Sequence, residues 1–174
     1  MTLKERKTRE TSVRVELELK PGPLDIGTGF RLLDHFLETL ARHGEIGLTL
    51  SASGDGTEDN HHLVEDVAIT LGEALGEALG DRSVARFGWA IVPMDESLVR
   101  CAVDLVDRPY FSSNMSDPLF LHFMRSFCFR VPMTLHLDVL KPGERHHETE
   151  ACFKALGISL REAKRPAKEF PTVK

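Results

Sequence analysis

Six of the eight histidines in the chain belong to a pattern of possible metal ligands that occurs twice. Each occurrence has one isolated histidine and, further along, two adjacent histidines with a glutamate four residues after the first of them. The two sets are His35, His61, His62 and Glu65, and His122, His146, His147 and Glu150. Imidazole and carboxylate groups bind divalent transition metals in proteins. A lone surface pair of histidines is more often solvated or structural, but the duplicated set favours metal binding.

The spacing within each set indicates how many ions it can serve. On a helix, His61 and Glu65 share a face and can hold one ion together. His62 points about 100° away from His61, because the helix has 3.6 residues per turn, so it does not readily serve the same ion. We therefore expect each helix to contribute to two ions, with the second histidine coming from the other helix. One isolated histidine then completes each site, with positions left open for substrate, and zinc, iron and manganese all remain candidates.

The likeness between the two halves of the chain extends beyond these ligands. The segment HHLVEDVAITLGEAL, which begins at His61, is similar to HHETEACFKALGISL, which begins at His146. Gly72 and Gly157 fall in register in this alignment. Chance similarity between amphipathic helices explains shared apolar positions, but not two copies of a His-His-Glu set. The chain is therefore expected to be one β/α unit used twice, which determines its architecture.

Periodicity and turn signals predict the elements that carry the ligands. Strands are expected at residues 12–19, 24–26, 47–53, 85–92, 98–105 and 133–140, and helices at residues 32–43, 61–79, 119–127 and 146–163. The first repeat is expected to span residues 1–84 and the second residues 85–174, each with the order β-β-α-β-α and the second with a C-terminal tail. Both His-His-Glu sets then begin a helix, and both isolated histidines lie on the preceding helix.

Composition excludes several classes of protein. The chain has 174 residues, of which 41% are hydrophobic and 28% charged, with a net charge of −5. A mildly acidic chain without a basic stripe does not suit nucleic acid, and no apolar run is long enough to cross a bilayer. The N-terminus lacks the apolar core of a signal peptide. Its three cysteines are scattered in apolar surroundings, which predicts reduced, buried thiols in a cytoplasmic protein.

Four segments resemble the imidazoleglycerol-phosphate dehydratases, from about Arg9 to Ala163. They are LLDHFLETLARHG, DNHHLVEDVAITLGEAL, VPMDESLVRCAVDLVDRPY and RHHETEACFKALGISLREA, which are similar to the family's DHML, D-x-HH-x-x-ED, MDE with GRPY, and HH-x-x-E segments. The resemblance implies an α+β fold: an internally duplicated β/α unit of the ribosomal protein S5 domain 2-like type, with two sheets enclosing a layer of four helices. It also implies one catalytic domain with two Mn²⁺ per subunit, in a large symmetric homo-oligomer built from trimers whose active sites lie at subunit contacts.

The resemblance implies the dehydration of imidazole-glycerol phosphate to imidazole-acetol phosphate in histidine biosynthesis. The proton to be removed lies on an unactivated carbon, so the enzyme must supply an electron sink. With both ring nitrogens bound to metal, the imidazole is held as imidazolate and can expel the side-chain hydroxyl. Proton transfer also needs a positioned side chain. The family's acid/base glutamate corresponds best to Glu10, and an exposed carboxylate at a strand edge is the alternative interpretation.

Basic residues at matching positions are the expected contacts of the substrate phosphate, a group that arginine binds well. They are Arg86, Arg108 and Lys154, with Thr172 and Lys174 in the C-terminal tail, and each alone resembles an ordinary surface residue. His43 matches a position near the family's substrate but could instead cap a helix C-terminus. Asp95 and Glu96 are expected either to orient metal-bound imidazoles or to form a turn.

Three departures from the family pattern leave other functions open. Thr39 stands where many members carry Gln, Asp107 replaces the usual Gly, and the stretch before His122 is shorter than is common. The shortened stretch and the missing Gln suit a non-catalytic metal-binding assembly protein on the same scaffold. A metallohydrolase with a metal-bound hydroxide is a third alternative. The phosphate-binding residues favour the dehydratase, because metal storage needs no phosphate clamp and a hydrolase needs no pair of ions spaced for one imidazole ring.

Overall fold

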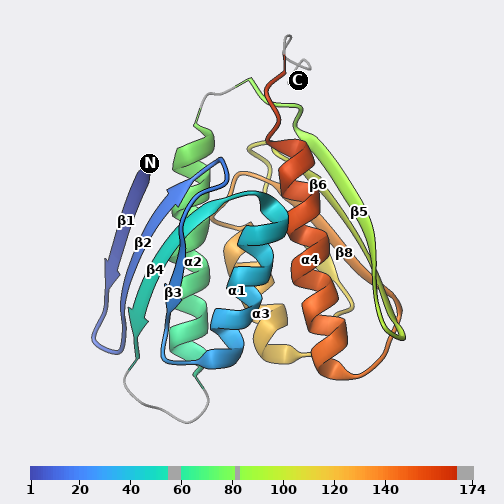
Figure 1. Ribbon diagram of the computed structural model, residues 1–174, viewed down its shortest axis with the longest axis horizontal. Helices are drawn as coiled ribbons and strands as arrows, with labels where there is room; N and C mark the ends of the chain where they lie inside the picture. Colours follow the sequence, from blue (N-terminus) through green and yellow to red (C-terminus); the bar gives the residue numbers. More distant parts are fainter. Residues whose placement is uncertain (55–59, 81–82, 168–174) are drawn as a thin grey trace.

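The computed structural model describes residues 1–54, 60–80 and 83–167. The first half contains β1 (Thr2–Lys7), β2 (Ser12–Glu18), β3 (Leu24–Gly27), α1 (Arg31–Gly44), β4 (Gly47–Ser53) and α2 (His61–Leu79). The second half contains β5 (Phe87–Met94), β6 (Ser97–Asp104), β7 (Tyr110–Ser113), α3 (Pro118–Cys128), β8 (Thr134–Lys141) and α4 (Arg145–Ala163). The two halves therefore share the order β-β-β-α-β-α, which can be followed by colour in Figure 1.

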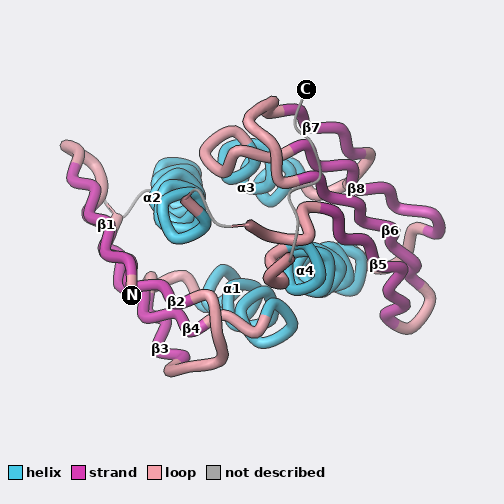
Figure 2. Tube along the Cα trace, turned by 90° about the horizontal axis from the view of Figure 1, so that it is seen from above, coloured by secondary structure: helices cyan, strands magenta, loops and turns pink. Residues whose placement is uncertain are grey.

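Each half forms one four-stranded sheet, and the two sheets have the same topology. Their strand orders are β1-β2-β4-β3 and β5-β6-β8-β7, with the last pair of each sheet parallel and the other pairs antiparallel. The four helices lie between the sheets as one layer (Figures 1 and 2). This arrangement confirms the predicted α+β fold with a duplicated β/α unit.

Two strands, β1 and β7, were not predicted from the sequence. Strand β1 turns Thr2, Lys4 and Arg6 toward the protein, so it lacks the alternating apolar residues by which a half-buried strand is predicted. Its inward polar side chains find partners on α2, where Arg6 donates to Asp66 at 2.6 Å. Strand β7 has only four residues, too few for a periodic pattern. Relative to the predicted order β-β-α-β-α, the first repeat therefore has β1 as its additional strand, and the second repeat has β7.

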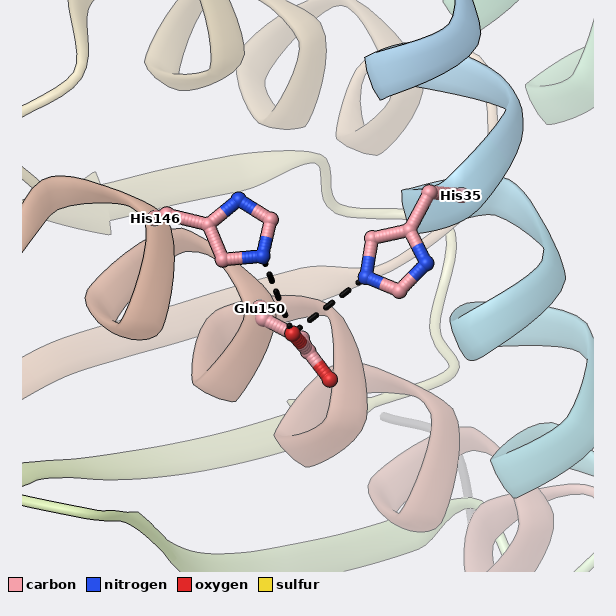
Figure 3. A group of neighbouring side chains, drawn as sticks. All are labelled: His35, His146 and Glu150. Carbon is pink, nitrogen blue, oxygen red and sulfur yellow. Dashed lines mark hydrogen bonds and ion pairs between the residues drawn. The ribbon is translucent and has the colours of Figure 1, made fainter.

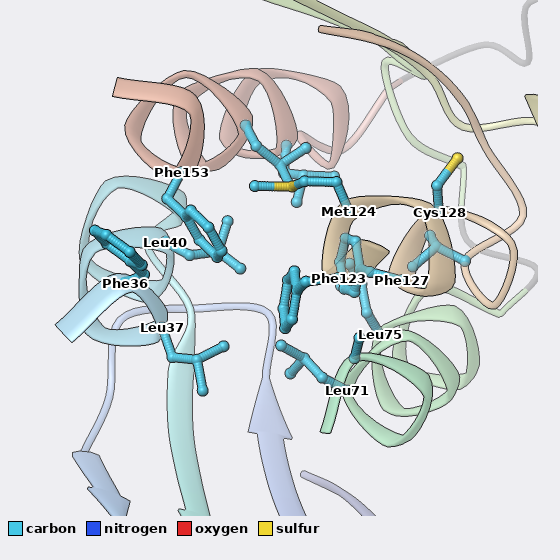
Figure 4. Packing of buried hydrophobic residues seen from close by; sticks show 14 of the residues in the cluster. Phe36, Leu37, Leu40, Leu71, Leu75, Phe123, Met124, Phe127, Cys128 and Phe153 are labelled. Atoms are coloured by element: carbon cyan, nitrogen blue, oxygen red, sulfur yellow. The ribbon is translucent and has the colours of Figure 1, made fainter. Parts of the chain in front are cut away.

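The core lies in the helix layer and joins the two halves. Its largest side chains are phenylalanines from α1, α3 and α4, which are at most 1% exposed: Phe36, Phe120, Phe123, Phe127 and Phe153. The ring centroids of Phe36 and Phe153 lie 5.1 Å apart, within the range of favourable aromatic pairs (Figure 4). Because α1 belongs to the first half and α4 to the second, this contact closes one core around both.

Two glycines at equivalent positions let helices from opposite halves approach closely. Helix α1 packs against α4, and α2 packs against α3. A Cβ at Gly157 would lie 2.7 Å from the Leu40 carbonyl oxygen of α1, and a Cβ at Gly72 would lie 2.8 Å from the Phe127 carbonyl oxygen of α3. Both distances are shorter than a side chain tolerates. The register of these glycines in the repeat thus reflects two matching helix contacts.

The three cysteines are buried free thiols, as the sequence predicted. None of the described helices combines the length and apolar character needed to cross a membrane.

Candidate metal centre and active site

The first group of potential metal ligands joins α1 of the first half to α4 of the second. His35 Nε2 and His146 Nε2 each lie 3.3 Å from Glu150 Oε2 (Figure 3). The two imidazole rings are stacked, with centroids 5.6 Å apart and planes inclined by 10°. His146 and Glu150 share a face of α4 because they are four residues apart. The potential ligand atoms of all three side chains lie within 4.8 Å of one another, close enough to bind one ion.

The N-terminus of α4 is held in place by a side chain that sequence reasoning missed. The Glu144 carboxylate accepts hydrogen bonds from the backbone N–H groups of His146, at 2.9 Å, and His147, at 3.3 Å. It therefore caps the helix and orients the turn that carries both histidines. An acidic residue directly before the turn that carries the His-His pair was the available signal.

The surroundings of Glu150 favour its ionised form. Burial alone would raise its pKa, but hydrogen bonds with Lys154 and His35 outweigh that effect, and the pKa of Glu150 is lowered. Lys154 Nζ lies 2.8 Å from Glu150 Oε1, so it contacts the oxygen that does not face the two histidines. The lysine thus neutralises one carboxylate oxygen and leaves the other for an ion.

The second group joins α2 of the first half to α3 of the second. It consists of His61, Glu65 and His122, whose potential ligand atoms also lie within 4.8 Å of one another. The His61 and His122 rings are stacked with centroids 4.6 Å apart, and His122 Nε2 lies 3.5 Å from Glu65 Oε1. His122 Nε2 is buried and has no hydrogen-bond partner within the described part of the chain. An orphaned buried nitrogen that faces a carboxylate fits a metal ligand.

The second histidine of each pair lies apart from these groups, beside a carboxylate in a hairpin turn. His62 Nδ1 lies 3.7 Å from Glu10 Oε2, in the turn between β1 and β2. His147 Nδ1 lies 3.2 Å from Glu96 Oε2, and His147 Nε2 lies 3.6 Å from Asp95 Oδ2, in the turn between β5 and β6. Within one chain, the structure therefore does not bring His62 to His35 or His147 to His61.

The two hairpin turns are equivalent in the repeated topology. Glu10 thus occupies, relative to His62, the place that Asp95 and Glu96 occupy relative to His147. The hydrogen bond with Glu96 raises the pKa of His147, and the backbone N–H of Glu144 lowers the pKa of Glu96. Sequence reasoning gave these carboxylates separate roles, because turns of different length hide their equivalence.

The predicted phosphate contacts are spread over the protein. Arg86, just before β5, is paired with Asp104, and Lys154 is paired with Glu150. Arg108 is exposed in the loop after β6, where its carbonyl accepts a hydrogen bond from Thr134 Oγ1 at 3.1 Å. Thr172 and Lys174 lie outside the described residues.

His43 lies in the last turn of α1, on the same helix as His35. Burial, together with the positive charges of Lys154 and Arg161, lowers the pKa of His43. The imidazole is therefore biased toward its neutral form, which can both donate and accept hydrogen bonds.

Comparison with known proteins gives one family for nearly the whole chain. The family profile described as imidazoleglycerol-phosphate dehydratase matches residues 28–160. A protein of that name from Chloroherpeton thalassium is 42% identical over 170 residues, which cover 91% of this chain and 88% of that protein. One from Methanopyrus kandleri is 44% identical over 174 residues, covering 91% and 87%.

Solved structures agree with this result. A crystal structure of IGPD from Pyrococcus furiosus with a bound compound superposes with a TM-score of 0.84 at 36% identity, covering 97% of each chain. That of imidazoleglycerol-phosphate dehydratase from Staphylococcus aureus gives 0.83 at 30% identity, covering 95% of this chain and 99% of that one. The chain therefore belongs to the imidazoleglycerol-phosphate dehydratase family, the hydro-lyases of histidine biosynthesis.

Proposed function

We propose that this protein is a metal-dependent dehydratase that converts imidazole-glycerol phosphate to imidazole-acetol phosphate and water in the cytoplasm. The observation that carries the metal dependence is the pair of matching ligand groups on α1 with α4 and on α2 with α3. Each group combines two imidazoles and one carboxylate from elements far apart in the sequence. A scaffold without metal would gain nothing from repeating that set at two equivalent places.

The residues present fit two Mn²⁺ ions per subunit. His35, His146 and Glu150 would hold one ion, and His61, Glu65 and His122 the other. Mixed nitrogen and oxygen ligands suit a divalent first-row metal, and the orphaned nitrogen of His122 would gain a partner. Bound ions would supply Lewis-acid chemistry and a template for the imidazole ring of the substrate. His62 and His147 would complete the two ligand sets from neighbouring subunits.

The protein's own residues then bind the substrate and move protons. We assign acid/base catalysis to Glu10, whose carboxylate is exposed beside His62 and can reach a bound substrate. Glu96 would fix the orientation of His147 through Nδ1, and Asp95, which lies near Nε2, would give that nitrogen up to an ion. Neutral His43 is suited to a hydrogen bond with the substrate.

The substrate phosphate would be bound by guanidinium and ammonium groups. We assign this role to Arg86, Arg108, Lys154 and Lys174, with the Thr172 hydroxyl as a further, uncharged donor. Arg108 is exposed, whereas Arg86 and Lys154 are half-buried, so Arg108 can approach a phosphate that is bound in a neighbouring subunit. Lys154 would shift from Glu150 toward the phosphate or bridge the two.

We also propose a large symmetric homo-oligomer built from trimers. The position of His62 and His147 outside the two ligand groups supports this assembly, because ligands from a second copy are then needed. A second support is the outer face of β5, where Phe87, Trp89 and Ile91 are 51%, 72% and 60% exposed. An apolar stripe of this kind on a sheet surface is typical of an interface.

The test is an assay for imidazole-acetol phosphate with enzyme that has been stripped by a chelator. We expect no product without metal and recovery of turnover when Mn²⁺ is added. Equal turnover in the stripped and reloaded enzyme would exclude the metal dependence. Absence of product with every divalent metal tried would exclude the dehydratase itself.

A further inference from the structure

We infer that Asp104 is a positioning residue that holds Arg86 so that one edge of its guanidinium is presented to the substrate phosphate. The inference rests on the proposed phosphate role of Arg86. It adds a residue on β6 that sequence reasoning did not consider.

Asp104 and Arg86 form a two-point contact at one end of the second sheet. Arg86 Nε donates to Asp104 Oδ1, and Arg86 Nη2 donates to Asp104 Oδ2 at 3.0 Å. The side chains are 12% and 18% exposed, so water competes with this pair less than it does at the open surface. Asp104 pairs in register with Phe87, the residue after Arg86. The strand pairing therefore places the carboxylate directly beside the arginine.

The backbone of Arg86 is constrained as strongly as its side chain. Its φ is +73°, in the left-handed region that residues other than glycine seldom adopt. The Arg86 N–H donates to the Ala163 carbonyl at 2.9 Å, and the Arg86 carbonyl accepts from the Leu105 N–H at 2.9 Å. Its guanidinium carbon also lies 4.9 Å from the centre of the Phe87 ring. A strained residue held from four directions is typical of a functional position.

The hydrogen bonds to Asp104 determine which donors remain. A guanidinium has five N–H donors, and Asp104 uses the Nε donor and one of the two on Nη2. Asp104 leaves both donors of Nη1 and one donor of Nη2, and these three N–H groups lie on the edge of the guanidinium that faces away from Asp104. Two parallel N–H groups on that edge match two oxygens of a phosphate. Asp104 thus lowers the net positive charge beside the phosphate but fixes the orientation of the Arg86 guanidinium.

A second arginine–aspartate pair on the same sheet provides the matched control. Arg100 of β6 donates to Asp138 of β8 through Nε at 3.2 Å and Nη2 at 2.9 Å. That pair lies on the exposed outer face, and both bonds go to one carboxylate oxygen. Asp138→Asn therefore removes the same charge from the same sheet without contacting Arg86. Its oligomeric state is measured beside that of the wild type, because Arg100 pairs in register with Ile91 on the outer face proposed as an interface.

The experiment compares Asp104→Asn, Asp104→Glu, Asp138→Asn and Arg86→Lys with the wild-type holoenzyme. Each is measured for KM, kcat, metal content and the rise in Tm caused by inorganic phosphate. Because a freed arginine must be ordered again by each substrate, we expect KM to rise about tenfold in Asp104→Asn, with kcat and metal content nearly unchanged. Phosphate should stabilise this variant and Arg86→Lys less than it stabilises the wild type, and Asp138→Asn should behave as wild type.

An unchanged KM and an unchanged phosphate effect in Asp104→Asn would overturn the inference, as would a normal phosphate effect in Arg86→Lys. If Asp104→Asn does not fold, Asp104→Glu decides, since its displaced carboxylate should still raise KM. A wild-type protein that makes no product would refute the proposed function instead, and the phosphate effect on Tm would still test the role of Asp104.

Discussion

His35 Nε2 lies 3.3 Å from Glu150 Oε2, although the two residues are 115 positions apart in the chain. The contact joins the first helix of one half to the second helix of the other. His122 and Glu65 repeat this relationship at the equivalent helix pair. Each candidate metal centre therefore depends on the packing of the two halves and not on either half alone.

We predict that the purified protein binds close to two divalent ions per subunit. His61 and His146 lie in separate ligand groups, so replacing either one with alanine should remove about one ion, and replacing both should remove most of the metal. Elemental analysis after mild dialysis measures this directly. A wild-type ratio near one, or a double variant with unchanged metal, would contradict the two-site proposal.

Changing the proposed acid/base residue should affect turnover but not metal. Glu10→Gln keeps the shape of the side chain and removes the titrating group, so we expect turnover to fall by about 10²–10⁴-fold. Glu65→Gln and Glu150→Gln should instead lose metal and recover in part with excess Mn²⁺. Turnover, substrate affinity and metal content of the three variants are compared side by side. Normal turnover in Glu10→Gln would leave Glu10 as an edge carboxylate and make Glu96 the next candidate.

Separating α1 from α4 should weaken one metal centre. In Gly157→Ala the new Cβ would meet the Leu40 carbonyl oxygen at 2.7 Å, so the helices must move apart. We expect a loss of about 1–3 kcal/mol in the free energy of unfolding and weaker metal binding by His35 and Glu150. Gly27→Ala is the control, because a Cβ there meets nothing within 4 Å. Equal stability and metal affinity in the two variants would show that the close approach is unimportant.

Stability should fall in alkaline solution because of the buried thiols. Burial raises the pKa of Cys101 and of Cys128 to about 12. Above the ordinary thiol pKa the unfolded chain loses these protons while the folded chain keeps them, so the unfolded state is favoured as pH rises. Each thiol contributes about 1.4 kcal/mol per pH unit in the window between the two pKa values. Denaturant titrations at pH 8 and pH 10.5 measure the free energy of unfolding of the wild type and of Cys101→Ala. An equal fall in this free energy between the two pH values in both proteins would contradict the prediction.

Assembly should be visible in the fluorescence of the single tryptophan. Trp89 is 72% exposed in one chain, so an emission maximum typical of a buried indole would report its burial between copies. Trp89→Glu should break or shrink the oligomer, as measured by size-exclusion chromatography with light scattering. Leu3→Glu, on the outer face of the other sheet, is the control and should leave the assembly intact. A wild-type emission typical of exposed indole would place the interface elsewhere.

The sequence by itself determined the duplicated unit, the helices and the candidate ligands. These features follow from local spacing: His146 and Glu150 share a face in any helix, and apolar periodicity marks the helices and most strands. The family resemblance further indicated Glu10 and the proposed phosphate contacts. Strands β1 and β7 escaped prediction because one faces inward with polar side chains and the other is very short.

Only the tertiary structure decided which residues meet. Spacing predicted that each ion would take its second histidine from the other His-His helix, whereas within one chain His35 joins Glu150, and His62 lies beside Glu10. The pairing of Arg86 with Asp104 likewise depends on strand register. Such contacts arise from packing between distant segments, because the close approach of helices at Gly157 and the register of strands are properties of the folded core that local sequence patterns do not encode.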